Sequence, residues 1–132
     1  MILSILVPVY NEETTIVDVL NTLLSVSLMN NIEKEIIIVD DCSTDRSQEV
    51  ITRFISDNVG IDIKLFSFSK NKGKGAAIRK AIEESTGDYI VIQDADLEYD
   101  PTDILEFLEE NKKYKYDLIM GSRFIGKKRS VL

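Results

Sequence analysis

The chain has 132 residues, 16 of them Lys or Arg and 23 Asp or Glu, which gives a formal net charge of −7 at pH 7. Its length predicts one domain, and its 44% apolar and 30% charged residues are typical of a globular protein with a buried core. The absence of His and the single Cys exclude histidine-based catalytic triads, His-ligated zinc, internal disulfides and paired-cysteine metal sites.

Short runs rich in Ile and Val alternate with longer segments of helical periodicity, which is typical of a parallel sheet covered by helices. The first strand is predicted near residues 3–7 and precedes a helix capped by Asn11. The second is predicted near residues 35–40, and Ser43 or Thr44 is expected to cap the helix that follows it. The nearly continuous apolar run in this strand suits burial on both faces of the sheet.

The third strand is predicted near residues 63–67, and the next helix begins in the glycine turn 71–75 and stops at Gly87. A fourth strand near residues 89–93 precedes a helix with Asp100 at the cap and Pro101 at its first position. A fifth strand is predicted near residues 117–121. The predicted fold class is therefore α/β, with a mostly parallel sheet and helices on both faces.

Right-handed crossovers bring the C-terminal ends of parallel strands to one edge of the sheet, where ligands bind in open α/β folds. Polar clusters follow each predicted strand, at residues 8–12, 40–45, 70–75, 94–98 and 121–123. The sequence therefore predicts one ligand site built from several loops.

Two carboxylates, Asp94 and Asp96, directly follow the fourth predicted strand, and Glu98 lies two residues further on. Oxygen ligands of this kind suit Mg²⁺ or Mn²⁺, which take a few carboxylates and fill the remaining positions with water and substrate phosphate. The alternative is a polar turn before the Asp100 cap. The buried strand on one side and the helix cap on the other favour a metal site.

The segment 71–77 is a glycine-rich turn that opens a helix, so its backbone N–H groups and Lys74 could face an anion. Its spacing matches neither a Walker loop nor a dinucleotide fingerprint. A flexible surface turn is an equally good interpretation of the pattern taken alone.

Tyr10 and Glu12 follow the first strand, where a ring can support a base and a carboxylate can accept hydrogen bonds from base or ribose. The alternatives are a packed ring and helix capping. Asp41 follows the second strand and is open to the same capping interpretation. Cys42 is interpreted as a small filler residue, because the chain has no His to activate a thiol.

Basic residues at 70–80 precede a stretch from Glu83 to Glu110 that has no Lys or Arg, and further basic residues follow it. Solvated helix faces explain most of these acids, but they explain Asp94, Asp96 and Glu98 less well. The acidity argues against nucleic acid as a partner. With no apolar run of about 20 residues, we expect a cytoplasmic protein whose peripheral contact with a membrane would use the basic residues Lys127, Lys128 and Arg129.

Six motifs in this order resemble the catalytic domain of glycosyltransferase family 2, and in particular the polyprenyl-phosphate sugar transferases such as the dolichyl-phosphate mannose synthases. They are Pro8-Val9-Tyr10-Asn11-Glu12, Val39-Asp40-Asp41-Cys42-Ser43-Thr44-Asp45, Asn71-Lys72-Gly73-Lys74-Gly75, Gly87-Asp88-Tyr89, Asp94-Ala95-Asp96-Leu97-Glu98 and Gly121-Ser122-Arg123-Phe124. The resemblance covers nearly the whole chain and implies a GT-A fold, Rossmann-like in its nucleotide-binding half.

The resemblance also implies roles for individual residues. A nucleoside would be held by Pro8, Tyr10, Glu12 and Asp41, with Asp41 on the base. The ribose and diphosphate would meet Asp94, Ala95 and Asp96, and the divalent metal would bind Asp96 together with Asp94 and Glu98. Lys74 would lie near the nucleotide, and Arg123 near the phosphates of donor or acceptor.

The family comparison leads us to expect an inverting, metal-dependent transfer of a sugar from a GDP- or UDP-linked donor to a polyprenyl phosphate or a saccharide. Glu98 departs from the Gln that is common in the mannose synthases, and the chain stops at Leu132, soon after the last motif. We therefore expect residues 1–132 to be a donor-binding part whose acceptor-binding part is missing. The alternatives are a nucleotide-sugar-binding module without transferase activity and, less favoured, a sugar-phosphate nucleotidyltransferase.

Overall fold

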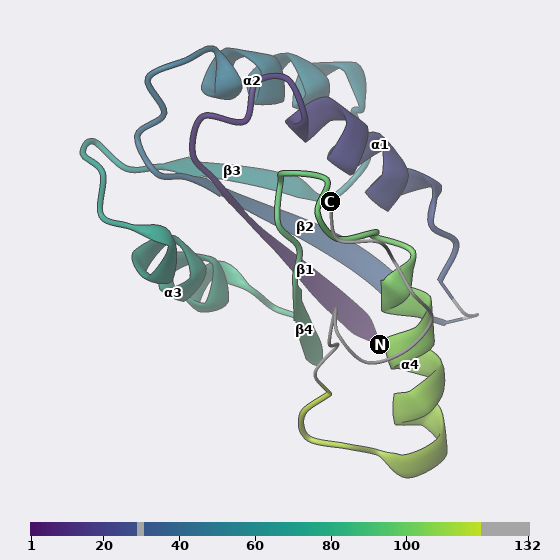
Figure 1. The fold of residues 1–132 in the computed structure, drawn as a ribbon. Coiled ribbons are helices and arrows are strands. Elements are labelled where there is room, and N and C mark those ends of the chain that lie inside the picture. The colour runs from purple at the N-terminus through teal and green to yellow at the C-terminus, as the bar shows by residue number, and fades with distance from the viewer. Residues whose placement is uncertain (29–30, 120–132) are drawn as a thin grey trace.

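The computed structural model describes residues 1–28 and 31–119, in which helices and strands alternate along the chain (Figure 1). The strands form one sheet in the order β3-β2-β1-β4, and every pair of neighbours is parallel. The elements are β1 (Ile2–Val9), α1 (Ile16–Ser25), β2 (Glu33–Asp40), α2 (Ser47–Asp57), β3 (Ile63–Ser67), α3 (Lys74–Glu84), β4 (Tyr89–Ile92) and α4 (Asp103–Tyr114).

Four of the five predicted strands are confirmed, each within two residues of its expected start and end. The fifth, expected at residues 117–121, lies partly outside the described residues, and residues 117–119 do not form a strand. The central strands β1 and β2 carry nearly continuous Ile, Leu and Val and are buried over most of their length. This burial on both faces is what the apolar runs predicted.

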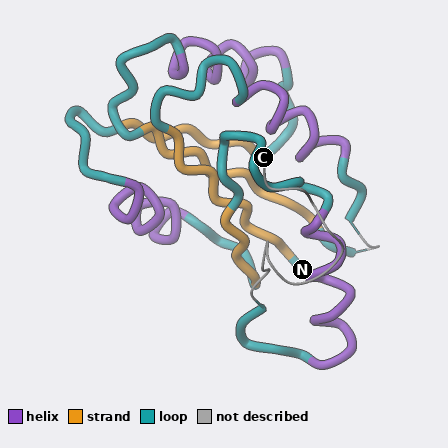
Figure 2. The backbone as a smooth tube through the Cα atoms, in the orientation of Figure 1, coloured by secondary structure: helices purple, strands orange, loops and turns teal. Residues whose placement is uncertain are grey.

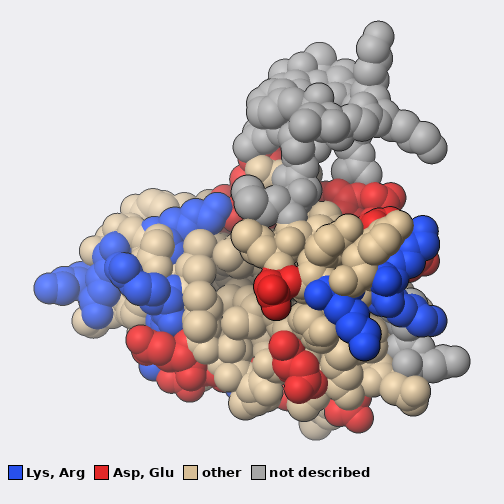
Figure 3. Space-filling view, turned by 90° about the horizontal axis from the view of Figure 1, so that it is seen from below, with Lys and Arg blue, Asp and Glu red and all other residues tan. Residues whose placement is uncertain are grey.

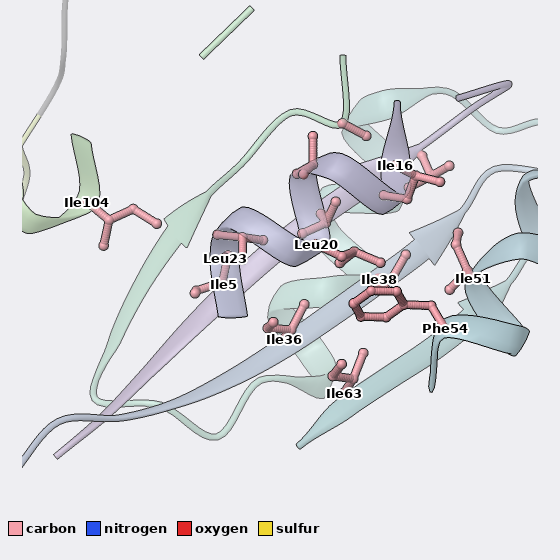
Figure 4. Close-up of a cluster of buried hydrophobic side chains, with 14 of the residues drawn as sticks. Ile5, Ile16, Leu20, Leu23, Ile36, Ile38, Ile51, Phe54, Ile63 and Ile104 are labelled. Atoms are coloured by element: carbon pink, nitrogen blue, oxygen red, sulfur yellow. The ribbon is translucent and has the colours of Figure 1, made fainter. Parts of the chain in front are cut away.

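Helices cover both faces of the sheet, as predicted (Figure 2). Helices α1 and α2 pack on one face, and Ile104 and Leu108 of α4 belong to the same large apolar cluster (Figure 4). Helix α3 covers the opposite face, where Ala77 and Ala81 pack against β1 and β2 in a smaller cluster. Within the part of the chain that the structure describes, no helix is both long and apolar enough to cross a membrane.

The predicted helix starts are wrong at three of the four helices. Helix α1 has Thr15, not Asn11, at its N-cap, and α2 begins at Ser47, beyond the expected caps Ser43 and Thr44. Helix α4 begins at Asp103, because the amides of residues 103–105 bond to carbonyls three residues back, so that the segment before the helix forms a turn. The Asp100 side chain accepts a hydrogen bond from the Thr102 amide within that turn. Helix α3 does begin within the expected glycine turn, but it ends at Glu84, before Gly87.

A buried carboxylate, Glu35, joins three parts of the sheet near the start of β2. It accepts hydrogen bonds from Ser4 Oγ of β1 at 2.5 Å and from the Thr86 amide, ahead of β4, at 2.5 Å. Lys64 Nζ of β3 lies 3.2 Å from its second oxygen. Gly87 also donates to Ser4 Oγ, and an added Cβ at Gly87 would lie only 2.8 Å from the Ser4 nitrogen, so this approach requires glycine.

Glu35 gives a testable dependence of stability on pH. Burial raises its pKa, but hydrogen bonds from Ser4, Thr86 and Lys64 together outweigh burial and lower the pKa from 4.5 to about 2. Because the folded pKa lies below the unfolded one, the stabilisation is complete above about pH 4.5 and is lost as the pH falls towards 2.

We therefore expect the difference in free energy of unfolding between the wild type and Glu35→Gln to narrow by roughly 2 kcal/mol between pH 6 and pH 3. Urea unfolding at a series of pH values measures this difference. The exposed neighbour Glu33, changed to Gln, is the matched control. A difference between wild type and Glu35→Gln that stays constant with pH would contradict this assignment.

Candidate functional site

A cavity of about 350 Å³ lies at the C-terminal edge of the sheet, where the sequence predicted a ligand site. Loops after β1, β2, β3 and β4 all contribute to its wall. Eight predicted site residues line it, together with Val9, Asn71, Gly73 and Ala77, which the sequence analysis did not single out as site residues. The eight are Pro8, Tyr10, Glu12, Asp41, Lys74, Asp94, Ala95 and Asp96.

The loop after β1 presents Tyr10 and Glu12 to this cavity. Tyr10 is 47% exposed, so its ring is available at the cavity mouth and is not the packed core aromatic that the alternative interpretation proposed. Glu12 is half-buried, and its amide donates to Ser47 Oγ at 2.8 Å. Since α1 begins only at Ile16, neither Asn11 nor Glu12 occupies its N-cap.

The loops after β1 and β2 are held together by hydrogen bonds between their polar side chains and backbones. Asn11 adopts a left-handed conformation with φ of 52° and accepts a hydrogen bond from the Thr44 amide at 2.8 Å. Asp45 accepts from the amides of Ser47 and Glu13. Burial raises the pKa of Asp45, but the hydrogen bonds from the Ser47 hydroxyl and from the amides of Ser47 and Glu13 outweigh burial and leave the pKa below its usual value. The residues expected to cap helices therefore fix one loop against the other.

Asp41 is 3% exposed and joins the end of β2 to the glycine turn. One carboxylate oxygen accepts from the Lys72 amide at 2.6 Å and the other from the Gly73 amide at 2.9 Å. Gly73 has φ of 91°, a conformation that favours glycine. The glycine turn is thus tied to the sheet, and two of the amides predicted to face a ligand anion already bind the Asp41 carboxylate.

The loop after β4 carries the two candidate metal ligands on either side of a buried residue. Ala95 is 3% exposed, whereas Asp96 is exposed and Asp94 is half-buried. The Gln93 amide extends the pairing with β1 by donating to the Leu6 carbonyl at 2.9 Å. Asp94 and Asp96 both line the cavity, so the loop directs two carboxylates towards the same space.

Lys74, at the start of α3, forms an ion pair with Asp94 across the cavity. Its Nζ lies 2.5 Å from Asp94 Oδ1, and the side chains are 58% and 20% exposed respectively. An ammonium group therefore already neutralises one of the two carboxylates. A cation that binds Asp94 must displace Lys74 or share the carboxylate with it.

The three predicted metal ligands are not gathered into one cluster. Glu98 does not line the cavity, and the described residues contain no group of three or more His, Cys, Asp or Glu side chains that could hold a metal. Asp94 and Asp96 nevertheless supply the oxygen donors that Mg²⁺ and Mn²⁺ prefer, and such ions commonly use one or two carboxylates with water and substrate phosphates. The donor set fits a metal that is bound jointly with a diphosphate.

Charged side chains are grouped by sign on one face of the molecule. In Figure 3, basic side chains gather in two separate groups, one at the α3 side and one at the α4 side, with carboxylates between them. Lys70, Lys72 and Lys74, which precede or begin α3, are exposed. Arg123 and residues 127–129, which were predicted to meet phosphates and a membrane, lie outside the described residues.

Comparison with known proteins places this site in a family. The pattern of glycosyl transferase family 2 matches residues 4–131. The chain is 33% identical over 131 residues to poly-beta-1,6-N-acetyl-D-glucosamine synthase of Staphylococcus epidermidis, covering 98% of this chain and 30% of that protein. It is 29% identical over 121 residues to dodecaprenyl-phosphate galacturonate synthase of Rhizobium johnstonii, covering 92% and 36%. The chain spans about a third of the length of these relatives.

Solved structures have the same fold. TarS 1–349 of S. aureus in complex with UDP has a TM-score of 0.75 at 24% identity, covering 98% of this chain and 39% of that one. The mannosyltransferase PcManGT from Pyrobaculum calidifontis, in complex with GDP-Man and Mn²⁺, has a TM-score of 0.66 at 28% identity, covering 72% and 27%. The expected GT-A fold is confirmed. With the family pattern matched along nearly its whole length, the chain belongs to glycosyl transferase family 2.

Proposed function

We propose that this chain binds a nucleoside-diphosphate sugar together with Mg²⁺ or Mn²⁺ and serves as the donor-binding part of an inverting glycosyltransferase. The observation that carries the proposal is the convergence of Tyr10, Asp41 and the carboxylates Asp94 and Asp96 on one cavity. These residues offer a ring for a base, an acceptor for base N–H groups and oxygen ligands for a cation. The bound nucleotides of TarS and PcManGT support the same substrate class.

Each part of the donor has a proposed partner. The Tyr10 ring and Pro8 support the base, and Asp41 accepts its N–H donors with the lone pairs that the Lys72 and Gly73 amides leave free. Glu12 accepts from the ribose hydroxyls. Ala95 lies beside the ribose and diphosphate, between the two carboxylates that hold the metal.

The chemical step requires stabilisation of the negative charge that develops on the leaving diphosphate. A bound divalent cation supplies this as a Lewis acid, and removing such a contact typically costs about 3–4 kcal/mol in the barrier. Asp96 is proposed to hold that cation with Asp94, while Lys74 and Arg123 meet the phosphates. Glu98, which does not line the cavity, is not included in the proposed metal site. An acceptor that is already a phosphate anion needs little general base, whereas a saccharide hydroxyl needs a carboxylate base.

The acceptor is proposed to be a polyprenyl phosphate or a saccharide, since the two relatives named above are a dodecaprenyl-phosphate galacturonate synthase and a poly-beta-1,6-N-acetyl-D-glucosamine synthase. A cytoplasmic location with peripheral contact through Lys127, Lys128 and Arg129 is part of the same proposal. The second candidate is a nucleotide-sugar-binding module without transferase activity, in which the same cavity would bind the donor. Binding without sugar transfer would support this second candidate.

Metal-dependent nucleotide binding tests the proposal. UDP or GDP with Mn²⁺ is expected to raise the melting temperature by several degrees, because a ligand at about 100 times its Kd adds about 2.7 kcal/mol of stability. Asp96→Ala is expected to abolish the shift by removing the exposed metal ligand. Glu109→Gln, which removes an exposed carboxylate on α4, is the control and is expected to keep it. If neither nucleotide with Mn²⁺ shifts the wild type, the proposal is wrong.

The ion pair between Lys74 and Asp94 predicts that loss of the Lys74 ammonium group strengthens metal binding and weakens nucleotide binding. In Lys74→Met the Asp94 carboxylate is no longer neutralised, so the nucleotide-free chain is expected to bind Mn²⁺ about threefold more tightly, as measured by electron paramagnetic resonance. Affinity for UDP or GDP is expected to fall, because a cation near the phosphates is lost. Lys80→Met, which breaks an ion pair with Glu84, is the matched control. If Lys74→Met bound both ligands with unchanged affinity, Lys74 would have no role in binding either of them.

A further inference from the structure

Thr15 stands at the N-cap of α1 but does not use its side chain as a cap. A Thr at this position normally accepts a hydrogen bond from an amide in the first helical turn. Here the Thr15 hydroxyl donates instead to the carbonyl oxygen of Ala95, 80 residues further along the chain, at 2.6 Å. The side chain therefore contacts the loop after β4 rather than its own helix.

The contact falls at the centre of the proposed metal-binding loop. Ala95 lies between Asp94 and Asp96, so a fixed carbonyl at this residue restricts the backbone that carries both carboxylates. Strand β4 has four residues and pairs with β1, and the loop leaves the sheet immediately after it. An anchor from α1 at this point limits how far the two carboxylates can move relative to β1.

The same hydroxyl also touches the other side of the cavity. Thr15 Oγ1 lies 2.9 Å from Glu12 Oε2, and Glu12 lines the wall beside Tyr10. The hydroxyl has a single proton for three nearby acceptors, the third being the Glu12 carbonyl at 3.5 Å, and the shortest distance favours the Ala95 carbonyl. Thr15 thus links the loop proposed to hold the nucleoside with the loop proposed to hold the metal.

The start of α1 does not use this hydroxyl, because no capping hydrogen bond is formed to the Thr15 side chain. The amides of Thr15 and Ile16 both donate to the Glu12 carbonyl, at 3.2 and 2.9 Å. A capping role therefore does not account for the hydroxyl, and its position against Ala95 does.

We propose that Thr15 is a positioning residue that couples metal binding to nucleotide binding by fixing the Ala95 carbonyl. This inference rests on the proposed function, since it assigns the coupling to that same site. Loss of the hydroxyl leaves Pro8, Tyr10 and Asp41 in place but loosens the loop that carries Asp94 and Asp96. The strengthening of nucleotide binding by Mn²⁺ is then reduced, while metal-free binding changes little.

The test compares Thr15→Val, which removes the hydroxyl at nearly constant volume, with Thr15→Ser, which keeps it. Thr22→Val is the matched control, because Thr22 lies in the same helix and its hydroxyl donates at 2.9 Å to the Asp18 carbonyl within that helix. Calorimetry gives the Kd of UDP and of GDP with Mn²⁺ and with EDTA. Thr15→Val is expected to bind the nucleotide about tenfold more weakly than the wild type with Mn²⁺, and within twofold of the wild type with EDTA. Both Thr15→Ser and Thr22→Val are expected to bind it as the wild type does.

Hydrogen exchange of the ligand-free chain provides a second readout that does not depend on nucleotide binding. The amides of residues 95–98 are expected to exchange faster in Thr15→Val than in the wild type, with no change in Thr22→Val. Thr15→Ala serves the same purpose if the Val variant does not fold.

The outcomes separate this inference from the proposed function. The role of the hydroxyl would be overturned if Thr15→Val bound nucleotide with Mn²⁺ as tightly as the wild type. It would also be overturned if Thr15→Val and Thr22→Val lost affinity equally, or if Thr15→Ser bound as weakly as Thr15→Val. A wild type that binds neither nucleotide would overturn the proposed function and the coupling with it. Unchanged exchange at residues 95–98 would overturn the anchor itself.

Discussion

The buried carboxylate of Glu35 determines where the rest of the sheet can lie. A charge that is 1% exposed is costly unless it is hydrogen-bonded, and Glu35 obtains its partners from β1, from β3 and from the segment ahead of β4. Its bond to the Thr86 amide and the close approach of Gly87 to Ser4 place β4 beside β1. The position of β4 in turn sets where the candidate metal-binding loop leaves the sheet, at the opposite end of the strands.

Asp41 is the buried carboxylate at the C-terminal end of β2, and it binds the glycine turn as Glu35 binds the strands. Amides near the start of a helix commonly bind a ligand anion. Near the start of α3, two such amides instead bind the protein's own Asp41 carboxylate. The turn therefore shapes the cavity wall instead of binding phosphate through these amides. A carboxylate has about four acceptor positions, and the two that remain on Asp41 are available to the N–H groups of a base.

The sequence was sufficient for four of the five predicted strands and for eight of the residues that line the cavity, but not for the contacts between loops. Runs such as Ile36 to Val39 have few alternatives to a strand buried on both faces, so the strand positions were predictable. Asn11 and Ser43 carry the side chains of helix caps, yet they bond across to the neighbouring loop, and no local pattern distinguishes the two uses. The bond from Thr15 to Ala95 spans 80 residues and depends on a packing geometry that spacing does not reveal.

Electrostatics connects the acidic composition to the proposed metal. Of the charged side chains that line the cavity, four are carboxylates, namely Glu12, Asp41, Asp94 and Asp96, and one is the ammonium of Lys74. A nucleoside-diphosphate sugar adds two further negative charges, and like charges held a few ångströms apart repel strongly where water is partly excluded. Lys74 alone cannot balance this excess, because it is already paired with Asp94. A divalent cation held by Asp96 would reduce this repulsion, so the charge that argues against nucleic acid as a partner supports a donor that binds more tightly together with a metal.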